Sequence, residues 1–283
     1  MKRSRLWRRY ILFFFVAVIS IGIITIFLFK AYDYYNRQSH GVAENVFLEG
    51  INMEGYLPQE VSQIVELLAL ETERKPQNAE LTKRTGEISQ SKAGLIVDQE
   101  STIGLVLYSP PNTNLNLITY IVEPAITTEE LKKTTKVLGA YTTYFAGSPQ
   151  RYQNIKLAIS AINNTIVKPK HTFSFNLTTG PRTLSKGYQP APVIIGGNLA
   201  LGIGGGVCQV SSTLYNAVRK SNLEVLERHG HSKPVRYVPP NMDAAVAEGH
   251  IDFKFKNTKE ELIIVKAAVE GAKISIWILG REG

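Results

Sequence analysis

The sequence predicts an α+β protein that is held in a membrane by one N-terminal helix, and three observations lead to this prediction. The first is a run of 19 uncharged, mostly apolar residues at positions 11–29. The second is the helical spacing of apolar residues in the segments that follow Pro58 and Gln150. The third is a late series of short alternating segments, between residues 223 and 279, that is typical of an antiparallel sheet. Helices early and strands late in the main domain indicate the α+β class.

The composition is that of a globular chain, and the positive charge is concentrated at one end. The 283 residues are 44% hydrophobic and 20% charged, which excludes a disordered or collagen-like protein. The formal net charge is +8, and residues 1–30 hold six basic residues and no acid, which leaves a charge of +2 for the rest. A nucleic-acid binder carries a basic face on its folded part. We therefore expect no nucleic-acid partner.

Residues 11–29 are long enough to cross a lipid bilayer. At 1.5 Å per residue they span about 28 Å, close to the ~30 Å hydrocarbon core. A cleaved signal peptide has a shorter apolar core and a small-residue cleavage site, which residues 29–35 do not offer. The other alternative, a buried core helix, is disfavoured by the flanking basic residues. Positive charge stays on the cytoplasmic side, so we expect a single-pass anchor with residues 31–283 outside the cell.

Polar stretches divide the chain into segments with different expected roles. In order, we expect a cytoplasmic basic tail (1–10), the transmembrane anchor (11–29), a stalk (30–43), a small α+β domain (44–126), a connecting segment (127–148) and the main domain (149–283). The small domain, through GINMEGYLPQEVSQIVELLA and GLIVDQEST, weakly resembles peptidoglycan-binding modules. A plain spacer domain is the alternative.

The expected elements follow from periodicity and from turn residues. In the small domain we expect a helix from Pro58 and strands at 95–97, 103–107 and 115–122. A capped helix begins at Thr127 or Thr128 and ends at Gly139. In the main domain we expect a helix at 151–165 and a second helix over 209–220 that starts at or just before Cys208. We expect a loop at 176–187 and a glycine-rich segment at 196–206. The expected strands are 172–175, 193–195, 223–228, 235–238, 251–255, 262–269 and 274–279.

The only cysteine of the chain, Cys208, follows a glycine-rich segment, 202–206. A phosphate-binding loop is also glycine-rich, but no Lys-Ser/Thr pair follows and the G-x-G-x-x-G spacing is absent. We therefore interpret the glycines as a tight turn that presents Cys208 at a helix N-terminus, where the helix dipole lowers a thiol pKa. Backbone N–H groups there can form an oxyanion hole. The expected substrate-binding neighbours are Gly205, Gly206, Gln209, Ser211 and Ser212. A small buried cysteine without chemistry is the alternative.

A thiol nucleophile needs a base, and the base needs an orienting group. His231 is the preferred base and His229 the second choice, since both follow a predicted strand about twenty residues after Cys208. Asp243 is the preferred orienting residue and Asp252 the second choice. A zinc ion bound by the two histidines, Cys208 and Asp243 is an alternative, but no HExxH or paired-cysteine motif supports it. We therefore expect no metal or cofactor.

One arginine of the predicted loop at 176–187 is a candidate for substrate binding. Arg182 lies in the segment TGPRT, between two predicted strands. A guanidinium group pairs well with the carboxylate at the end of a peptide. A solvated loop arginine is an equally good interpretation.

Several segments together resemble the VanW family, which is named after an accessory protein of glycopeptide-resistance clusters in Gram-positive bacteria. The segments are TYFAGSPQRYQNIKLAISAINNTIVKPKHTFSFN, GGGVCQVSSTLYNAV and LEVLERHGHSKPVRYVP, and the resemblance covers residues 129–280. Some members are implicated as L,D-transpeptidases that cross-link peptidoglycan. The resemblance implies that Cys208 is the nucleophile, that His229 and His231 flank the site, and that peptidoglycan stem peptides are the partners. Lys170 and Pro240 replace glycines that are usual in the family.

We therefore expect a membrane-anchored cysteine acyltransferase of the L,D-transpeptidase type, facing the cell wall. Cys208 would attack the carbonyl before the terminal D-Ala of a tetrapeptide stem, and Arg182 would hold the terminal carboxylate. A cysteine peptidase or amidase on stem peptides shares the first half of this reaction. The other alternative is a non-catalytic envelope protein that binds the wall or a glycopeptide.

Overall fold

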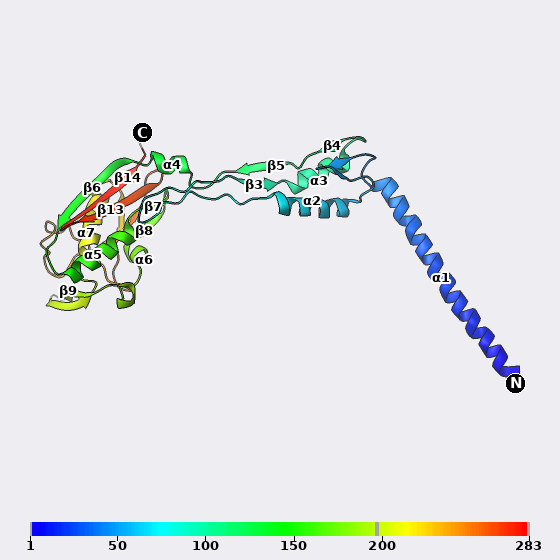
Figure 1. The fold of residues 1–283 in the computed structure, drawn as a ribbon, viewed down its shortest axis with the longest axis horizontal. Helices are drawn as coiled ribbons and strands as arrows, with labels where there is room; N and C mark the ends of the chain where they lie inside the picture. Colours follow the sequence, from blue (N-terminus) through cyan, green and yellow to red (C-terminus); the bar gives the residue numbers. More distant parts are fainter. Residues whose placement is uncertain (1, 196–197, 282–283) are drawn as a thin grey trace. The chain divides into compact units, whose positions relative to one another are not determined.

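The computed structural model describes residues 2–195 and 198–281, and it confirms the α+β class (Figure 1). The chain forms two compact units. The first contains Met1–Gln77 and Ala93–Glu123, and the second contains Asn78–Lys92 and Pro124–Gly283. This division differs from the predicted boundaries, because the chain passes between the units three times.

The first unit begins with a single long helix. Its elements are α1 (Lys2–His40), β1 (Phe47–Leu48), β2 (Ile51–Asn52), α2 (Pro58–Thr72), β3 (Gly94–Val97), α3 (Gln99–Tyr108), β4 (Asn114–Leu115) and β5 (Thr119–Val122). Within α1, an 18-residue window of Leu12–His40 reaches a mean hydropathy of 2.9, and this helix is long and apolar enough to cross a membrane by length and composition.

The predicted stalk is not a separate element. Helix α1 continues to His40, because Arg37 bonds Asp33 one turn earlier (3.0 Å) and reaches Glu60 at the start of α2 (2.7 Å). Val42, at the end of the predicted stalk, is buried in the apolar core of the first unit. The polar segment therefore connects the long helix to the folded unit through specific contacts.

Two strand predictions in this unit are wrong. The predicted strand 103–107 belongs to α3, which begins where the side chain of Asp98 accepts a hydrogen bond from the Ser101 N–H. Val106 is buried and Ile103 packs beside the same core, a spacing that fits a helix as well as a short strand. The predicted strand 115–122 is split into β4 and β5.

The second unit holds the larger core. Its elements are α4 (Thr128–Lys133), β6 (Lys136–Tyr144), α5 (Pro149–Ile162), β7 (Thr165–Val167), β8 (Thr172–Ser174), α6 (Phe175–Thr179), the 3₁₀ turn η1 (Leu184–Lys186), β9 (Pro190–Ile195), β10 (Asn198–Ile203), α7 (Val207–Lys220), β11 (Glu224–Glu227), β12 (Lys254–Lys256), β13 (Ile263–Glu270) and β14 (Lys273–Gly280). An antiparallel sheet of order β6-β14-β13-β7 carries α5 and α7, and a smaller sheet has the order β11-β12-β8.

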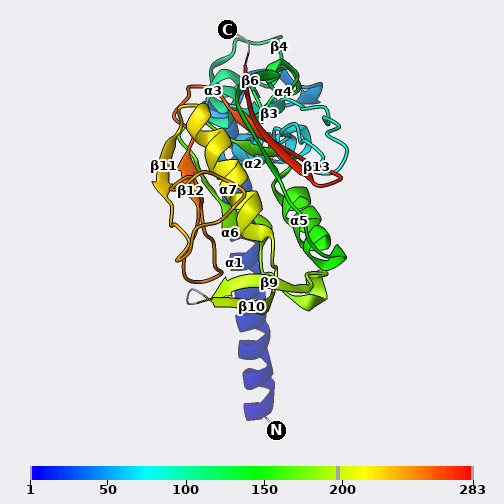
Figure 2. The ribbon, with the colours of Figure 1, turned by 90° about the vertical axis from the view of Figure 1, so that its left-hand side faces the viewer.

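The two helices are amphipathic and bury their apolar faces on the large sheet. Ile155 and Ile162 of α5 and Leu214 of α7 are fully buried, together with Ile274 and Ile276 of β14. Figure 2 shows the antiparallel hairpin of β9 and β10 across the ends of these helices. The start of α7 therefore lies where helix, hairpin and loops meet.

Several expected boundaries in this unit are wrong for identifiable reasons. Helix α4 ends at Lys133, and Gly139 lies inside β6, where a Cβ atom would come within 2.6 Å of the Ala217 carbonyl oxygen of α7. This glycine permits a close approach and does not end a helix. The predicted strand 235–238 is irregular. The expected loop 176–187 contains most of α6 and all of η1. The glycine-rich segment 196–206 contains β10, and its residues 196–197 lie outside the described residues.

Residues 78–92 were expected within the small domain but pack with the second unit. The side-chain amide of Asn164 donates to the carbonyl oxygens of Thr82 and Lys83, at 3.0 and 3.1 Å. Asn164 has a φ of 53°, and Lys170, which replaces the glycine usual in the family, has a φ of 61°. Asparagine adopts this left-handed region more readily than most residues.

Candidate active site

A pocket of about 510 Å3 opens in the second unit where α7 begins. It brings together six of the predicted site residues, namely Arg182, Gly205, Gly206, Cys208, Gln209 and His231. Its remaining walls come from the β9–β10 hairpin and from the segment between residues 235 and 248. The predicted nucleophile, the preferred base and the candidate arginine therefore share one cavity.

Cys208 occupies the second position of α7, directly after a turn that only glycines can form. Gly206 has a φ of 110°, and a Cβ atom on it would lie 2.9 Å from the Ile155 side chain. A Cβ atom on Gly205 would lie 2.6 Å from the Pro192 carbonyl oxygen. The glycines allow the chain to pass between α5 and β9, which places the half-buried thiol at the pocket wall.

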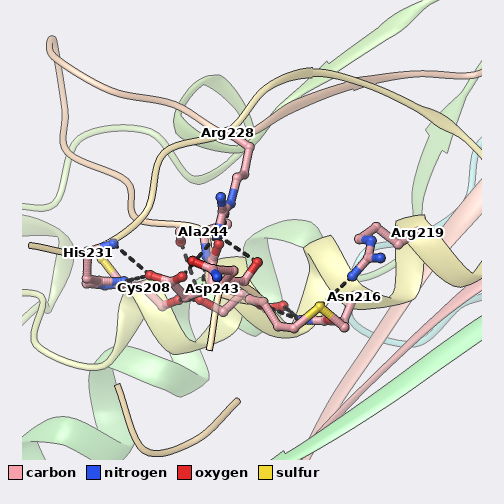
Figure 3. Close-up of polar contacts among 10 residues, drawn as sticks. Cys208, Asn216, Arg219, Arg228, His231, Asp243 and Ala244 are labelled. Atoms are coloured by element: carbon pink, nitrogen blue, oxygen red, sulfur yellow. Dashed lines mark hydrogen bonds and ion pairs between the residues drawn. The ribbon is translucent and has the colours of Figure 1, made fainter. Parts of the chain in front are cut away.

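His231 and Asp243 form a short contact beside this thiol (Figure 3). The Nδ1 of His231 bonds Asp243 Oδ2 at 2.5 Å, and the His231 backbone N–H donates to the same oxygen at 2.6 Å. The imidazole is 9% exposed and the carboxylate 12%. Because Nδ1 donates to the carboxylate, the other ring nitrogen is the one left to face the sulfur.

The backbone register explains why these two residues meet. His229 and Ala245 form an isolated antiparallel bridge, in which the Ala245 N–H donates to the His229 carbonyl oxygen at 2.7 Å. Two residues further along in opposite directions, His231 and Asp243 face each other. The loop that carries Asp243 is also tied to α7, because Ser212 Oγ accepts from the Ala244 N–H at 2.9 Å.

The three side chains shift one another's pKa values in the direction of a thiolate and an imidazolium. Burial alone would raise the pKa of the Cys208 thiol, but its hydrogen bond with His231 and the positive charges of His231 and Arg182 lower that pKa below its usual value. Burial opposes protonation of His231, but Cys208 and Asp243 raise the pKa of His231. For Asp243, hydrogen bonds from His231 overcome burial and lower the carboxyl pKa. A thiolate beside an imidazolium is the form that attacks carbonyl groups.

Arg228 completes this constellation and was not assigned a role from the sequence. Its Nε donates to the Asp243 backbone oxygen at 2.6 Å, and a terminal nitrogen donates to Asp243 Oδ1 at 3.0 Å. Its guanidinium carbon lies 5.3 Å from the centre of the Tyr215 ring on α7. Asp243 is therefore held on one side by Arg228 and on the other by His231 (Figure 3).

Further polar residues of the pocket were also missed. Arg151 lies in the first turn of α5 and donates to Gln209 Oε1 at 2.8 Å, and burial lowers its pKa. Tyr237 lies edge-on to the His231 ring, with 6.4 Å between ring centres, and burial raises the pKa of its hydroxyl. Glu248 lines the rim. The amphipathic pattern of α5 gave no sign that its first turn reaches the cavity.

Other predicted site residues have structural roles. The side chain of His229 bonds Glu227 at 3.2 Å and does not line the pocket. Ser212 donates to the Cys208 carbonyl oxygen at 2.8 Å and is buried, as is Ser211. Asp252 accepts hydrogen bonds from Ser174 Oγ at 2.5 Å and from the Asn176 N–H at 2.9 Å. Its carboxylate therefore bonds these two residues and does not orient His231.

The hydrogen bonds of Gln209 change its interpretation from a substrate-binding residue to a structural one. This residue lines the pocket, but its side-chain amide is used by Arg151, Thr143 Oγ1 (3.2 Å) and the Tyr144 carbonyl oxygen (2.9 Å). Gln209 thus connects α7 to α5 and β6.

Within the described residues, no cluster of three or more His, Cys, Asp or Glu side chains is arranged to hold a metal ion.

Comparisons with known proteins place this arrangement in a family. The model of the family "VanW like protein" matches residues 150–279, which include every residue of the constellation above. The uncharacterized protein YoaR of Bacillus subtilis (strain 168) is 37% identical over 240 residues, which cover 83% of this chain and 78% of that protein. The vancomycin B-type resistance protein VanW of Enterococcus faecalis (strain ATCC 700802 / V583) is 30% identical over 128 residues, 43% of this chain and 46% of that protein. No solved structure matches. The chain belongs to the VanW-like family.

Proposed function

We propose that this protein is a cysteine-dependent acyltransferase of the cell envelope, acting as an L,D-transpeptidase on peptidoglycan stem peptides. The observation that carries the proposal is that Cys208 and His231 line one pocket, while Asp243 bonds the Nδ1 of His231 at 2.5 Å. A nucleophile, a base and a group that orients the base are the parts that acyl transfer requires. The envelope location rests on α1, for which we propose a single membrane span with both folded units on the wall side.

The first half of the reaction forms a thioester. The Cys208 sulfur attacks the carbonyl carbon before the terminal D-Ala, and the carbonyl oxygen becomes an oxyanion. The neighbouring amides of Val207 and Gln209 donate to the oxygens of Gly204 and Gly206, both at 3.1 Å, whereas the Cys208 N–H has no such backbone acceptor among the described residues. We assign this N–H to the oxyanion. His231 then protonates the departing amine, and the C–N bond breaks.

The second half transfers the acyl group to an amine of a neighbouring stem. The amine nitrogen attacks the thioester, His231 takes its proton, and the sulfur leaves as a thiolate. Asp243 holds His231 in one tautomer through both steps. Arg182 and Arg151 give the pocket a positive potential, which suits a substrate that ends in a carboxylate.

Intact mass spectrometry tests the proposal directly. The full chain in detergent is incubated with a tetrapeptide stem, and we expect a covalent adduct with the mass of the tripeptide acyl group. Cys208→Ala should give no adduct. His231→Ala should slow adduct formation by about 10²–10⁴-fold, whereas His229→Ala, the matched histidine outside the pocket, should not. An adduct on Cys208→Ala, or none on the wild type, would refute the covalent mechanism.

The products then distinguish transfer from hydrolysis. With a second stem present, a transpeptidase yields a cross-linked dimer and a peptidase yields a free tripeptide. The half-buried sulfur favours transfer, because an acyl group bound to it is partly shielded from water. Free tripeptide as the only product would assign the chain to the peptidases.

A further inference from the structure

The β9–β10 hairpin turns an apolar face to the outside of the second unit. Leu201 pairs with Pro192 across the hairpin and Ile203 pairs with Pro190, so these four side chains share one face. All four are exposed, and Leu201 is 74% exposed. On the opposite face, Ala191 is buried against the glycine turn that leads into α7. The outer face of an antiparallel pair is normally polar, so this face is suited to an apolar environment.

The hairpin lies within a long stretch without charge. Residues 187–207 contain no Asp, Glu, Lys or Arg. The 3₁₀ turn η1, which comes directly before β9, adds Leu184, which is 59% exposed. The hairpin lies at the end of the second unit opposite α4 (Figure 1 and Figure 2). Single exposed apolar side chains are ordinary, but an exposed strand face made only of such side chains indicates a binding surface.

The elements that pack beside the hairpin carry positive charge. Residues 131–223, which include α5, both hairpin strands and α7, hold eleven Lys and Arg residues and no Asp or Glu. Lys186 ends η1 and Lys156 lies on α5, and both are exposed. The two elements are neighbours, since a Cβ atom on Gly187 would lie 3.6 Å from Leu157 Cδ1. Neither lysine forms an ion pair with another described residue. This surface therefore attracts an anionic partner.

Two exposed tyrosines border the same pocket as the hairpin. Tyr144 ends β6 and is 70% exposed, and its carbonyl oxygen accepts from the Gln209 side chain at 2.9 Å. Tyr152 follows the pocket residue Arg151 in the first turns of α5, and its ring centre lies 6.2 Å from that of Phe145. Tyrosine is enriched at the level of lipid headgroups, because its ring is apolar and its hydroxyl is polar. Apolar, aromatic and cationic groups together match the layers of a membrane surface.

We propose that the outer face of the β9–β10 hairpin docks on a lipid bilayer that contains anionic lipids. An anionic polymer of the wall satisfies the lysines but leaves Leu201 and Ile203 in water. A second copy of this chain covers the apolar face but brings two basic surfaces together, and like charges repel. A bilayer satisfies both, with acyl chains for the apolar face and headgroup phosphates for the lysines. The proposed membrane span of α1 also supplies the bilayer.

Docking also affects the pocket. Pro192 and Ile203 line the pocket as well as the outer face of the hairpin, so a docked bilayer borders the pocket opening. The inference goes beyond the proposed function and does not depend on it, since the surface binds lipid whatever the chemistry of Cys208. It gives the chain a second membrane contact, separate from α1.

Quenching of a fluorescent label by lipids tests the docking. The full chain with Cys208→Ala and Leu201→Cys has one thiol, which is labelled with an environment-sensitive NBD fluorophore. It is reconstituted in vesicles of phosphatidylcholine, either alone or with an equal amount of phosphatidylglycerol, that also contain a lipid with a nitroxide on its acyl chain. We expect strong quenching in the phosphatidylglycerol vesicles. The matched control carries the label at Glu129→Cys on α4, an exposed position at the opposite end of the unit, and should not be quenched.

A charge variant and the alternative outcomes complete the test. Lys156→Gln combined with Lys186→Gln should lower the equilibrium constant of docking by roughly tenfold in phosphatidylglycerol vesicles. No quenching at position 201, or equal quenching at positions 201 and 129, would overturn the proposal. Quenching that ignores both lipid charge and the double variant would overturn the preference for anionic lipids. A blue-shifted emission without lipid quenching, lost when the protein is diluted with more lipid, would assign the face to a second copy and overturn the bilayer.

Discussion

Replacing Asp243 with asparagine tests whether the carboxylate sets the ionisation of the site. Asp243 Oδ2 accepts two hydrogen bonds from His231, at 2.5 and 2.6 Å, and the carboxylate is only 12% exposed. A hydrogen bond to a buried charged group contributes roughly 1.5–3 kcal/mol, and one pKa unit corresponds to about 1.4 kcal/mol. Asp243→Asn should therefore lower the pKa of His231 and raise the pKa of Cys208, each by roughly one to two units.

The assay is the rate of Cys208 alkylation by iodoacetamide as a function of pH. The thiolate reacts, so the rate rises with pH through the pKa of Cys208. In the wild type this rise should lie below the usual thiol range, since the pKa of Cys208 is lowered. In Asp243→Asn the whole curve should move to higher pH, with the largest loss of rate near neutrality.

A matched control separates this electrostatic effect from a loss of stability. Asp252 is also a buried carboxylate, and its bonds go to Ser174 and Asn176 instead of His231. Asp252→Asn should lower the melting temperature and leave the pH midpoint of alkylation close to that of the wild type. An unchanged midpoint in Asp243→Asn would refute the coupling between Asp243 and the thiol.

Three further predictions follow from named contacts. Arg228→Met should raise the pKa of Cys208 in the same assay by roughly half a unit to one unit, and Arg228→Lys should recover part of the effect, because Arg228 acts through Asp243. If Arg228→Met shifts the pKa of Cys208 more than Asp243→Asn does, Arg228 does not act through Asp243. Gly139→Ala should destabilise the second unit by about 1–3 kcal/mol in denaturant unfolding, because the new Cβ meets α7 at 2.6 Å or less; an unchanged midpoint would show that α7 can shift. Hydrogen bonds with Arg37 lower the pKa of Glu60 to about 2, so their contribution to stability is present above the ordinary carboxyl pKa of 4.5 and is lost as the pH falls toward 2. The effect should be small, since solvent screens the pair, and Glu60→Gln should remove this pH dependence from thermal unfolding.

The sequence predicts those parts of the fold that depend on local pattern. A helix that starts at or just before Cys208 follows from a glycine turn and an amphipathic run, and α7 begins at Val207, in agreement with this prediction. The pair β13 and β14 follows from alternation, since Ile274, Ile276 and Ile278 all face the core. Patterns of this kind depend on residues that are near in sequence, and a single sequence contains that information.

The failures have a different physical origin. Glycine is typical of a helix end, but Gly139 instead lets β6 approach α7 closely. The contact is with Ala217, about eighty residues away in the sequence. Residues 103–107 are an apolar run that either a strand or a helix can bury. Residues 78–92 join the second unit through Asn164, a polar contact with no periodic signal. In each case the deciding contact is non-local.

The candidate site illustrates the same limit from the side of function. Residue type and spacing nominate Cys208, His231 and Asp243, because few side chains can act as nucleophile, base and orienting group. What makes them a site is the register that pairs His229 with Ala245, and that register depends on bonds from α7 to the loop of Asp243. Arg228 belongs to the site because it bonds the same loop at the Asp243 carbonyl oxygen, and no sequence motif predicts this contact. A sequence therefore identifies the groups capable of the chemistry, and long-range hydrogen bonds determine which of them meet at the sulfur.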